Sequence, residues 1–271
     1  FPERFHIPVK GFFKLKLNDT HFIYLEGHYT SFITRRLFWH GVKGFEYESV
    51  RVFMKIIGSC GVFMDIGANM GYYSLIAARV NPNMKIIAFE PFPDALTAFR
   101  RNIDRNDFRN IEIEEIALSD QQGETKLFYR INTDFPDELQ LAGNNTMVKF
   151  NDNRTETITV KTTTLDRYTK DKNLDRLEVI KIDTETTEYL ILSNGKEVIR
   201  KFRPVVICEV LCGFHEQELQ NLFDPLDYEI YRVEDVGLVK AADLISEKGE
   251  NFDYYFVPVE KKDWINQFVK N

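Results

Sequence analysis

Residues 62–74 read V-F-M-D-I-G-A-N-M-G-Y-Y-S, and this stretch decides the fold of the chain. Apolar residues lead to Asp65, a turn containing Gly67 and Gly71 follows, and helical spacing begins near Tyr72. Glycines at such a turn let a ligand approach the backbone closely, and the first turn of the following helix offers free N–H groups. The stretch therefore predicts a strand, a ligand-binding turn and a helix.

Strands and helices alternate beyond this turn. The predicted elements are strand 62–66, helix 72–80, strand 85–90, helix 94–106, strand 111–117, strand 179–183, helix 187–201, strand 205–210 and helix 216–223. Such alternation is typical of βαβ units and a parallel sheet. The near-continuous apolar runs at 179–183 and 205–210 suit central strands that are covered on both faces.

Other segments predict additions to this core. They are an aromatic-rich hairpin at 11–16 and 21–25, an entry helix over 46–57, extra strands at 127–130 and 157–163 around a polar loop at 132–153, and strands at 228–233 and 254–259. The connection between the last two strands lacks a clear helix, which predicts an antiparallel edge. The polar loop is long enough to be a lid or an insertion.

The composition is that of an ordinary globular chain. Its 271 residues are 44% hydrophobic and 28% charged, which suits one large α/β domain or a domain plus a small appendage, and we favour the single domain. We expect residues 1–58 to pack as strands and an entry helix on a core domain at 59–271, in one compact unit. The net charge of −7 gives no electrostatic reason to expect nucleic acid as a partner. No stretch approaches the roughly 20 apolar residues that cross a bilayer.

Cysteine usage bears on the compartment. Cys60, Cys208 and Cys212 are few and odd in number for a disulfide scaffold, and they lack the paired spacing of a zinc site. This pattern favours a reducing, cytoplasmic setting. The chain begins with Phe1 rather than Met, so an upstream segment can be missing.

Three successive strand ends predict a nucleotide-like site. The acid that ends the second strand, Glu90, suits the two hydroxyls of a ribose, and the backbone near Ala117 suits an adenine edge. Open α/β sheets bind ligands at this edge, outside the carboxyl ends of their strands. The candidate cofactor-binding residues are Asp65, Gly67, Ala68, Asn69, Gly71, Glu90, Pro91, Ala117 and Leu118.

A nicotinamide-dependent oxidoreductase is the main rival. Its G-x-G-x-x-G fingerprint spaces the glycines more closely, to fit a pyrophosphate. Here Gly67 and Gly71 are four positions apart, and Asp65 stands just before them. A carboxylate at the turn repels a pyrophosphate but attracts the ammonium group and positive charge of S-adenosylmethionine. The sequence therefore favours S-adenosylmethionine as the cofactor.

Further motifs follow in a fixed order. They are G-F-E-Y-E at 44–48, D-I-G-A-N-M-G-Y-Y-S at 65–74, F-E-P at 89–91, A-L-S-D-Q-Q-G at 117–123, T-T-L-D-R-Y at 163–168, I-K-I-D-T-E-T-T-E at 180–188 and R-P-V-V-I-C-E at 203–209. In order and spacing this set resembles the FkbM-type family of class I methyltransferases, over most of residues 44–210. The resemblance implies a Rossmann-like, doubly wound α/β fold whose mainly parallel, seven-stranded sheet has an antiparallel last strand. It also implies methyl transfer, usually to a hydroxyl on a sugar, a glycan or a small natural product.

One motif departs from the family pattern K-I-D-x-E-G-x-E. Thr186 and Thr187 stand where glycine and a small residue are typical, while Asp183, Glu185 and Glu188 are kept. Two β-branched residues narrow a close-packed turn. The departure threatens acceptor choice more than cofactor binding. It also leaves open a non-catalytic binding module with the same fold.

Methyl transfer to a hydroxyl requires a group that takes its proton. Asp183 is the first candidate and Glu185 the second, and Glu209 and His215, near the end of the next strand, could reach the same crevice. Helix capping is the alternative role of the two acids at 183 and 185, and a polar loop position is the alternative for the histidine. Asp183 and Glu209 could also hold a divalent metal, which the sequence leaves undecided.

Overall fold

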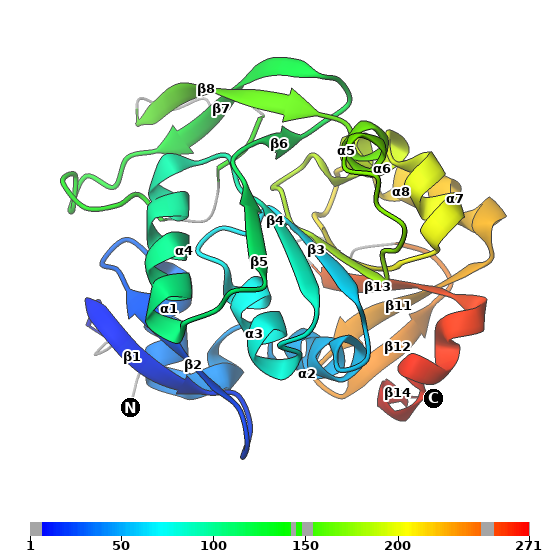
Figure 1. The fold of residues 1–271 in the computed structure, drawn as a ribbon, viewed down its shortest axis with the longest axis horizontal. Coiled ribbons are helices and arrows are strands. Elements are labelled where there is room, and N and C mark those ends of the chain that lie inside the picture. Colours follow the sequence, from blue (N-terminus) through cyan, green and yellow to red (C-terminus); the bar gives the residue numbers. More distant parts are fainter. Residues whose placement is uncertain (1–6, 142–144, 148–153, 245–251, 271) are drawn as a thin grey trace.

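The computed structural model describes residues 7–141, 145–147, 154–244 and 252–270. Within these residues the main sheet has nine strands in the order β14-β12-β11-β13-β10-β9-β3-β4-β5 (Figure 1). The strands are β3 (Val62–Ile66), β4 (Lys85–Phe89), β5 (Ile111–Glu114), β9 (Val179–Ile182), β10 (Val205–Val210), β11 (Tyr228–Glu234), β12 (Gly237–Ala241), β13 (Phe252–Pro258) and β14 (Val269–Lys270). The chain adds β4 and β5 on one side of β3, and it later adds β9 and β10 on the other side. A crevice is therefore expected between the carboxyl ends of β3 and β9.

The antiparallel strand expected at the end of a seven-stranded sheet is confirmed as β13, and β12 and β14 extend the sheet to nine strands in the described residues. β13 pairs antiparallel with both β10 and β11, so it lies between them rather than at the edge of the sheet. The edge beyond β11 is extended by β12, which pairs antiparallel with it, and then by β14. The sequence did not show β12, because its five residues lie within a polar connection.

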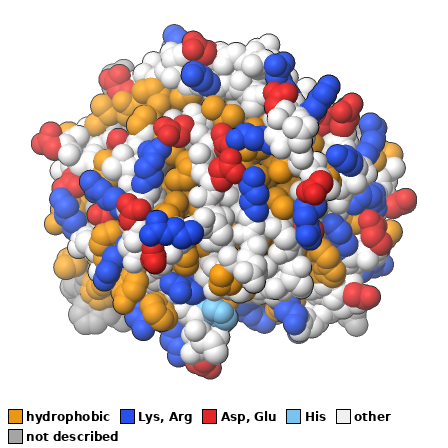
Figure 2. All heavy atoms as spheres, viewed as in Figure 1, with side chains coloured by type: hydrophobic (Ala, Val, Ile, Leu, Met, Phe, Trp, Pro, Cys, Tyr) orange, Lys and Arg blue, Asp and Glu red, His pale blue; other side chains and the backbone are white. Residues whose placement is uncertain are grey.

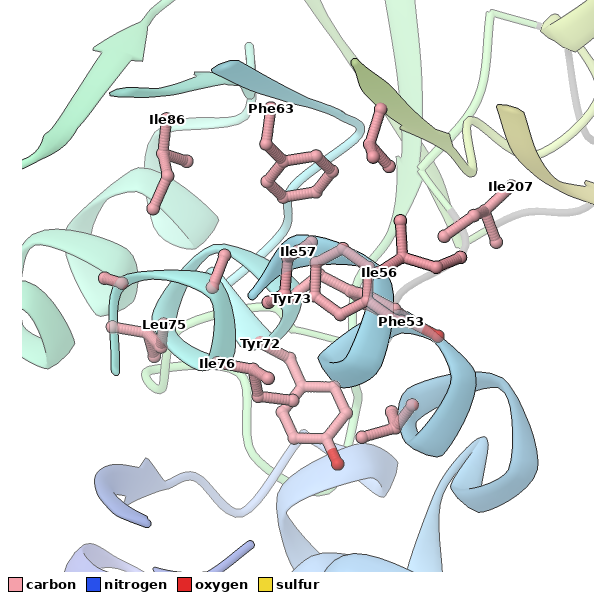
Figure 3. Close-up of a cluster of buried hydrophobic side chains, with 14 of the residues drawn as sticks. Phe53, Ile56, Ile57, Phe63, Tyr72, Tyr73, Leu75, Ile76, Ile86 and Ile207 are labelled. Atoms are coloured by element: carbon pink, nitrogen blue, oxygen red, sulfur yellow. The ribbon is translucent and has the colours of Figure 1, made fainter. Parts of the chain in front are cut away.

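Helices cover both faces of the main sheet (Figure 1). One face packs against α2 (Tyr47–Ile57), α3 (Tyr72–Val80) and α4 (Pro93–Asn106), and the other packs against α5 (Leu165–Asp171), α6 (Glu188–Ser193), α7 (Lys196–Phe202) and α8 (Glu216–Phe223). Successive side chains of a central strand point to opposite faces of the sheet, so they belong to two different hydrophobic cores. Phe63 packs on Phe53 of α2 near Tyr73 of α3 (Figure 3), whereas Met64 joins the core on the other face.

One helix prediction was wrong. The single helix expected over 187–201 is divided into α6 and α7, with a break at Asn194 and Gly195. A Cβ at Gly195 would lie 2.6 Å from a methyl carbon of Leu165 in α5. The break therefore lets this backbone approach α5 closely, which the helical spacing of the sequence did not reveal.

The predicted N-terminal hairpin is present as β1 (Gly11–Lys16) and β2 (Phe22–Gly27), and α1 (Phe32–His40) follows it. Two asparagines of α4 fix β2 in place. Asn102 accepts from the backbone N–H of Glu26, and Asn106 both accepts from and donates to the backbone of Tyr24, at 2.7–2.8 Å. These bonds attach the N-terminal segment to the same face of the core as α3.

A smaller sheet stands at the carboxyl edge of the main one (Figure 1). In the described part of the chain it contains β6 (Ala117–Leu118), β8 (Thr155–Thr163) and β7 (Gly123–Arg130), in that order. The strand predicted over 111–117 is thus divided between the two sheets. Of the polar loop predicted at 132–153, residues 142–144 and 148–153 lie outside the described residues. Residues 145–147 return to β7 through a bridge between Phe128 and Thr146.

The surface carries both signs of charge. On the face in Figure 2, Lys and Arg side chains are intermixed with Asp and Glu, and neither sign forms a continuous field. No helix among the described residues is long and apolar enough to cross a membrane.

Candidate active site

Two adjoining cavities open at the carboxyl ends of β3, β4 and β9. The apolar chamber has a volume of about 580 Å³, and its walls include Phe89, Glu90, Ile116, Ala117, Leu118 and Met147. The acidic chamber has a volume of about 880 Å³, and its walls include Phe32, Glu46, Tyr72, Lys181 and Glu209. Gly67, Asn69, Asp183 and Glu185 line both chambers. These four residues therefore form the boundary where contents of the two chambers would meet.

The glycine turn brings β3 and β9 together at this boundary. Gly67 has a φ of +79°, and a Cβ there would lie 1.9 Å from the backbone oxygen of Asp183. The N–H groups of Gly67 and Ala68 both donate to the carbonyl of Phe89, at 3.0 Å. A side chain at position 67 would thus collide with backbone, which cannot rotate aside. Only glycine allows this approach.

Glu90 presents a fixed carboxylate to the apolar chamber. Its two oxygens accept from the backbone N–H groups of Asn69 and Phe92, at 2.7 and 2.8 Å. Burial raises the pKa of Glu90 to about 7. Asn69 holds a left-handed φ of +52°, and its buried side-chain oxygen has no hydrogen-bond partner among the described residues. Both side chains keep polar capacity available for a ligand.

Asp65 faces the acidic chamber and also anchors α3. Its Oδ2 accepts from the backbone N–H of Ser74 at 3.0 Å and from the Ser74 hydroxyl at 2.5 Å. Burial raises the pKa of Asp65 to about 6, although the bonds from Ser74 oppose that shift. A positive charge placed in the chamber would favour the ionised form. The sequence had shown the acid but not its partner nine residues later.

Three predicted catalytic acids come together in the acidic chamber. Asp183, Glu185 and Glu209 each offer a carboxylate oxygen, and these atoms all lie within 4.8 Å of one another. Asp183 directly follows β9, and Glu209 lies in the neighbouring parallel strand β10. Burial raises the pKa of Glu209 to about 10, and the carboxylate of Asp183 adds to the shift. At neutral pH this acid therefore keeps its proton.

A buried lysine balances the carboxylates. The Lys181 ammonium lies 3.5 Å from Asp183 Oδ2 and 3.8 Å from Asp253 Oδ1, and the side chain is only 2% exposed. Burial alone would lower the pKa of Lys181, but the carboxylates of Asp183, Glu46 and Asp253 raise it well above the ordinary value. The ammonium thus stays charged. The catalytic set predicted from the sequence omitted Asp253, because nothing in its spacing marks a contact between β9 and β13.

The N-terminal segment supplies an aromatic wall of the acidic chamber. Phe32 and Ile33 of α1, Phe45 and Tyr72 line it, and the hydroxyl of Tyr72 is buried without a hydrogen-bond partner among the described residues. On the same side, Tyr73 donates a 2.6 Å hydrogen bond to Glu46. The sequence showed an aromatic-rich N-terminal region, but nothing in it assigned Phe32 or Ile33 to the site.

The predicted residues distribute unevenly over the two chambers. Gly67, Asn69, Glu90, Pro91, Ala117 and Leu118 line the apolar chamber. Asp65 and Ala68 line the acidic chamber. Gly71 lines neither, because it lies against the ring of Phe99, which a Cβ at position 71 would meet at 2.0 Å.

His215 is not brought to the acids. It precedes α8 at the protein surface, stacks on Tyr189, and places its Nδ1 3.6 Å from Glu218. The imidazole lines neither chamber and is 42% exposed. The loop after β10 carries it away from the crevice, so proximity in sequence to Glu209 does not become proximity in space.

The buried acids predict a loss of stability at alkaline pH. The pKa is raised to about 8 for Glu46, about 7 for Glu185 and about 10 for Glu209, in each case mainly by burial. Because the folded state then binds more protons than the unfolded state, stability falls as pH rises through these values. We expect the unfolding temperature of the ligand-free protein to drop by several degrees between pH 6 and pH 9. Differential scanning calorimetry across this range measures it.

Glu209→Gln is expected to flatten that profile, because an amide does not titrate. Glu124→Gln, which changes an exposed glutamate of β7, serves as the control and should keep the native slope. An unfolding temperature that stays constant from pH 6 to pH 9 would show that the acids are not buried as described.

Comparisons with known proteins identify the family. A family model described as the methyltransferase FkbM domain matches residues 65–237. Methyltransferase sdnD of Sordaria araneosa is 28% identical over 163 residues, which cover 49% of this chain and 60% of that protein. The 2-O-methyltransferase NoeI of Sinorhizobium fredii is 28% identical over 149 residues, which cover 52% of this chain and 60% of that protein.

A crystal structure of methyltransferase FkbM from Methylobacillus flagellatus matches with a TM-score of 0.44 and 16% identity, over 72% of this chain and 43% of that one. The chain spans about 60% of the length of the two curated relatives. The family model matches more than half of the chain and includes the turn at Gly67, Glu90 and all three clustered acids. The chain therefore belongs to the FkbM methyltransferase family.

Proposed function

We propose that this protein transfers the methyl group of S-adenosylmethionine to a hydroxyl of a sugar, a glycan or a small natural product. The observation that carries the proposal is the boundary between the two chambers. A donor in the apolar chamber and an acceptor in the acidic chamber would meet at Asp183 and Glu185, which line both. Family membership supports methyl transfer rather than hydride transfer.

The apolar chamber suits the adenosine part of the donor. Its lining is largely apolar with a few polar groups, as in small-molecule sites. The fixed carboxylate of Glu90 would accept the ribose hydroxyls, and Ala117 and Leu118 would face the adenine ring. The methionine part would then extend across Gly67 toward Asp65, whose carboxylate suits the ammonium group.

The reaction breaks the bond from the donor sulfur to the methyl carbon and forms a bond from that carbon to the acceptor oxygen. The sulfonium becomes a neutral thioether, and the hydroxyl proton must leave the acceptor. Asp183 would take this proton, because it stands at the boundary and its partner Glu209 keeps its own proton at neutral pH. Alignment of donor and acceptor supplies most of the remaining acceleration.

A divalent metal is the second way to activate the hydroxyl. Three carboxylates within 4.8 Å fit the ligand preference of a hard cation, and such an ion would lower the pKa of a bound hydroxyl. The Lys181 ammonium, however, lies 3.5 Å from Asp183 and competes for that carboxylate. We therefore propose that Lys181 supplies the local positive charge.

The acceptor is expected to be uncharged where it enters the chamber. Five carboxyl groups, those of Glu46, Asp65, Asp183, Glu185 and Glu209, line the acidic chamber against one ammonium. An acceptor with its own carboxylate or phosphate would find no free cation among these lining residues, because Asp183 and Asp253 already engage the Lys181 ammonium. The aromatic wall suits the apolar face of a ring, and the name of the relative NoeI, a 2-O-methyltransferase, supports oxygen as the methylated atom.

Binding of the demethylated cofactor tests the proposal directly. We expect S-adenosylhomocysteine to bind the native protein, and Glu90→Gln to weaken it by about 10- to 100-fold, because a site that loses an acceptor for buried hydroxyls is left with unpaired groups. Isothermal titration calorimetry measures both dissociation constants. Glu124→Gln is the control and should bind as the native protein does.

Two results would contradict the assignment. One is a native protein that binds a reduced nicotinamide dinucleotide but not S-adenosylhomocysteine. The other is a Glu90→Gln variant with native affinity, which would place the ribose elsewhere. Cofactor binding without methyl transfer to any acceptor in a broad sugar and natural-product panel would favour a binding module instead. The clustering of the three acids despite Thr186 supports an active enzyme.

A further inference from the structure

The loop that carries the catalytic acids is held in a strained conformation. Glu185 has a φ of +55° and Thr186 a φ of +95°, so two successive residues other than glycine lie in the left-handed region. A β-branched residue is an outlier there, because its Cβ crowds the following carbonyl. Such strain persists only where surrounding contacts fix the conformation.

Thr146 provides contacts of this kind. Its hydroxyl donates a 2.6 Å hydrogen bond to the backbone oxygen of Glu185 and lies 3.3 Å from the hydroxyl of Thr186. Thr146 is only 4% exposed. Its backbone exchanges two hydrogen bonds with Phe128 of β7, at 2.8 and 3.0 Å. The bonds of Thr146 therefore connect the smaller sheet to the loop at 183–187, which carries Asp183 and Glu185.

The same connection shapes both chambers. Asn145 and Met147, the immediate neighbours of Thr146, line the apolar chamber. Glu185, whose backbone Thr146 holds, lines both chambers and offers a carboxylate oxygen to the cluster with Asp183 and Glu209. A shift of Thr146 would thus move a wall of the donor space and an acid of the acceptor space together.

We propose that Thr146 and Thr186 form a clamp that positions the apolar chamber and Glu185 for methyl transfer. Both are positioning residues, because neither is placed to touch the reacting atoms. The clamp explains why this chain has threonine where the family pattern has glycine: the side chain that strains the turn also supplies the hydroxyl next to Thr146. The inference rests on the proposed function for its link to catalysis.

Thr186→Gly separates positioning from stability. Glycine relieves the backbone strain at φ +95° but removes the hydroxyl. We expect this variant to unfold at a temperature equal to or above that of the native protein, yet to bind S-adenosylhomocysteine about 5- to 10-fold more weakly. Calorimetric titration and thermal unfolding measure the two effects. A merely structural residue would move both in the same direction.

Three variants complete the test. Thr186→Ser keeps the hydroxyl and should retain affinity within about twofold, whereas Thr146→Val removes the hydroxyl from the other partner and should weaken binding about fivefold or more. Thr159→Val, on the exposed side of β8, is the control and should bind natively. Native affinity in both Thr146→Val and Thr186→Gly would overturn the clamp.

Thermal unfolding of single and double variants can test the clamp even if the proposed function fails. Should the native protein bind no S-adenosylhomocysteine, the effects of Thr146→Val and Thr186→Ala on the unfolding temperature still report the contact. The double variant is then expected to lose less than the sum of the single losses, because each removes the same interaction. Additive losses would overturn the clamp whatever the protein binds.

Discussion

Gly67→Ala is expected to abolish binding of S-adenosylhomocysteine and to lower the free energy of unfolding by at least about 3 kcal/mol. The added Cβ would lie 1.9 Å from the backbone oxygen of Asp183 and 2.9 Å from its carbonyl carbon. Neither segment can yield easily, because Gly67 and Asp183 directly follow the last paired residues of β3 and β9, Ile66 and Ile182, and the Asp183 N–H still donates to the Ile66 carbonyl. Any shift that relieves the clash would displace Asp183, and with it the boundary of the two chambers. Calorimetric titration and thermal unfolding measure both losses.

Gly41→Ala is the matched control for this prediction. Gly41 has a φ of +64°, close to that of Gly67, but a Cβ there would have no heavy atom within 4 Å. Its substitution therefore reports a backbone penalty without a clash, about 1–3 kcal/mol because its ψ of −156° lies in a region essentially restricted to glycine, with donor affinity unchanged. If Gly67→Ala were no more harmful than Gly41→Ala, the close approach of the two strands would not exist as described.

The central strands were predictable because two patterns in the sequence agree. Apolar runs at 62–66, 179–183 and 205–210 mark strands that are buried on both faces, and the residues between them have helical spacing. Short edge elements carry much weaker signals. β14 has two residues and β12 has five, and both lie where apolar residues are mixed with charged ones.

The residues of the apolar chamber could be located from the sequence because their contacts are local. Gly67, Asn69 and Glu90 act through backbone geometry at strand ends, and motif spacing records that geometry. The acidic chamber depends on contacts between segments that are far apart in sequence. Phe32 reaches the acidic chamber only because the hairpin is bonded to α4, and Lys181 meets Asp253 only because β13 inserts beside β10. Neither contact produces a periodic pattern in the sequence from which it could be predicted.

Thr186 shows how the fold can accommodate a departure from a family pattern. From the sequence, two β-branched residues in a tight turn predict a narrowed turn, with an acceptor side that differs or is impaired. The structure keeps the left-handed conformation at position 186 and still brings Asp183, Glu185 and Glu209 together. The new side chain instead gains a hydroxyl partner in Thr146, a residue 40 positions away. Only the folded chain could reveal this compensation.

Asp183→Asn is expected to lower kcat by about 10²- to 10⁴-fold, because an amide of the same size cannot take the proton of the acceptor hydroxyl. Affinity for S-adenosylhomocysteine should change less than about threefold, since the contacts proposed for the donor come from Glu90, Ala117 and Leu118. The measurements are steady-state methylation with an accepted hydroxyl substrate and calorimetric titration of the product. A fall in kcat with unchanged donor affinity separates proton transfer from cofactor binding.

Two further variants, His215→Ala and Glu185→Gln, test whether Asp183 rather than another residue is the base. His215 lies outside both chambers, so its loss should leave kcat within about twofold of the native value. Glu185 shares the boundary with Asp183, and its carboxylate is the nearest substitute for the base. If Asp183→Asn kept more than a tenth of native activity while Glu185→Gln lost it, the proton would pass to Glu185. The clamp between Thr146 and Thr186 would then orient the base itself, because Thr146 holds the backbone of Glu185.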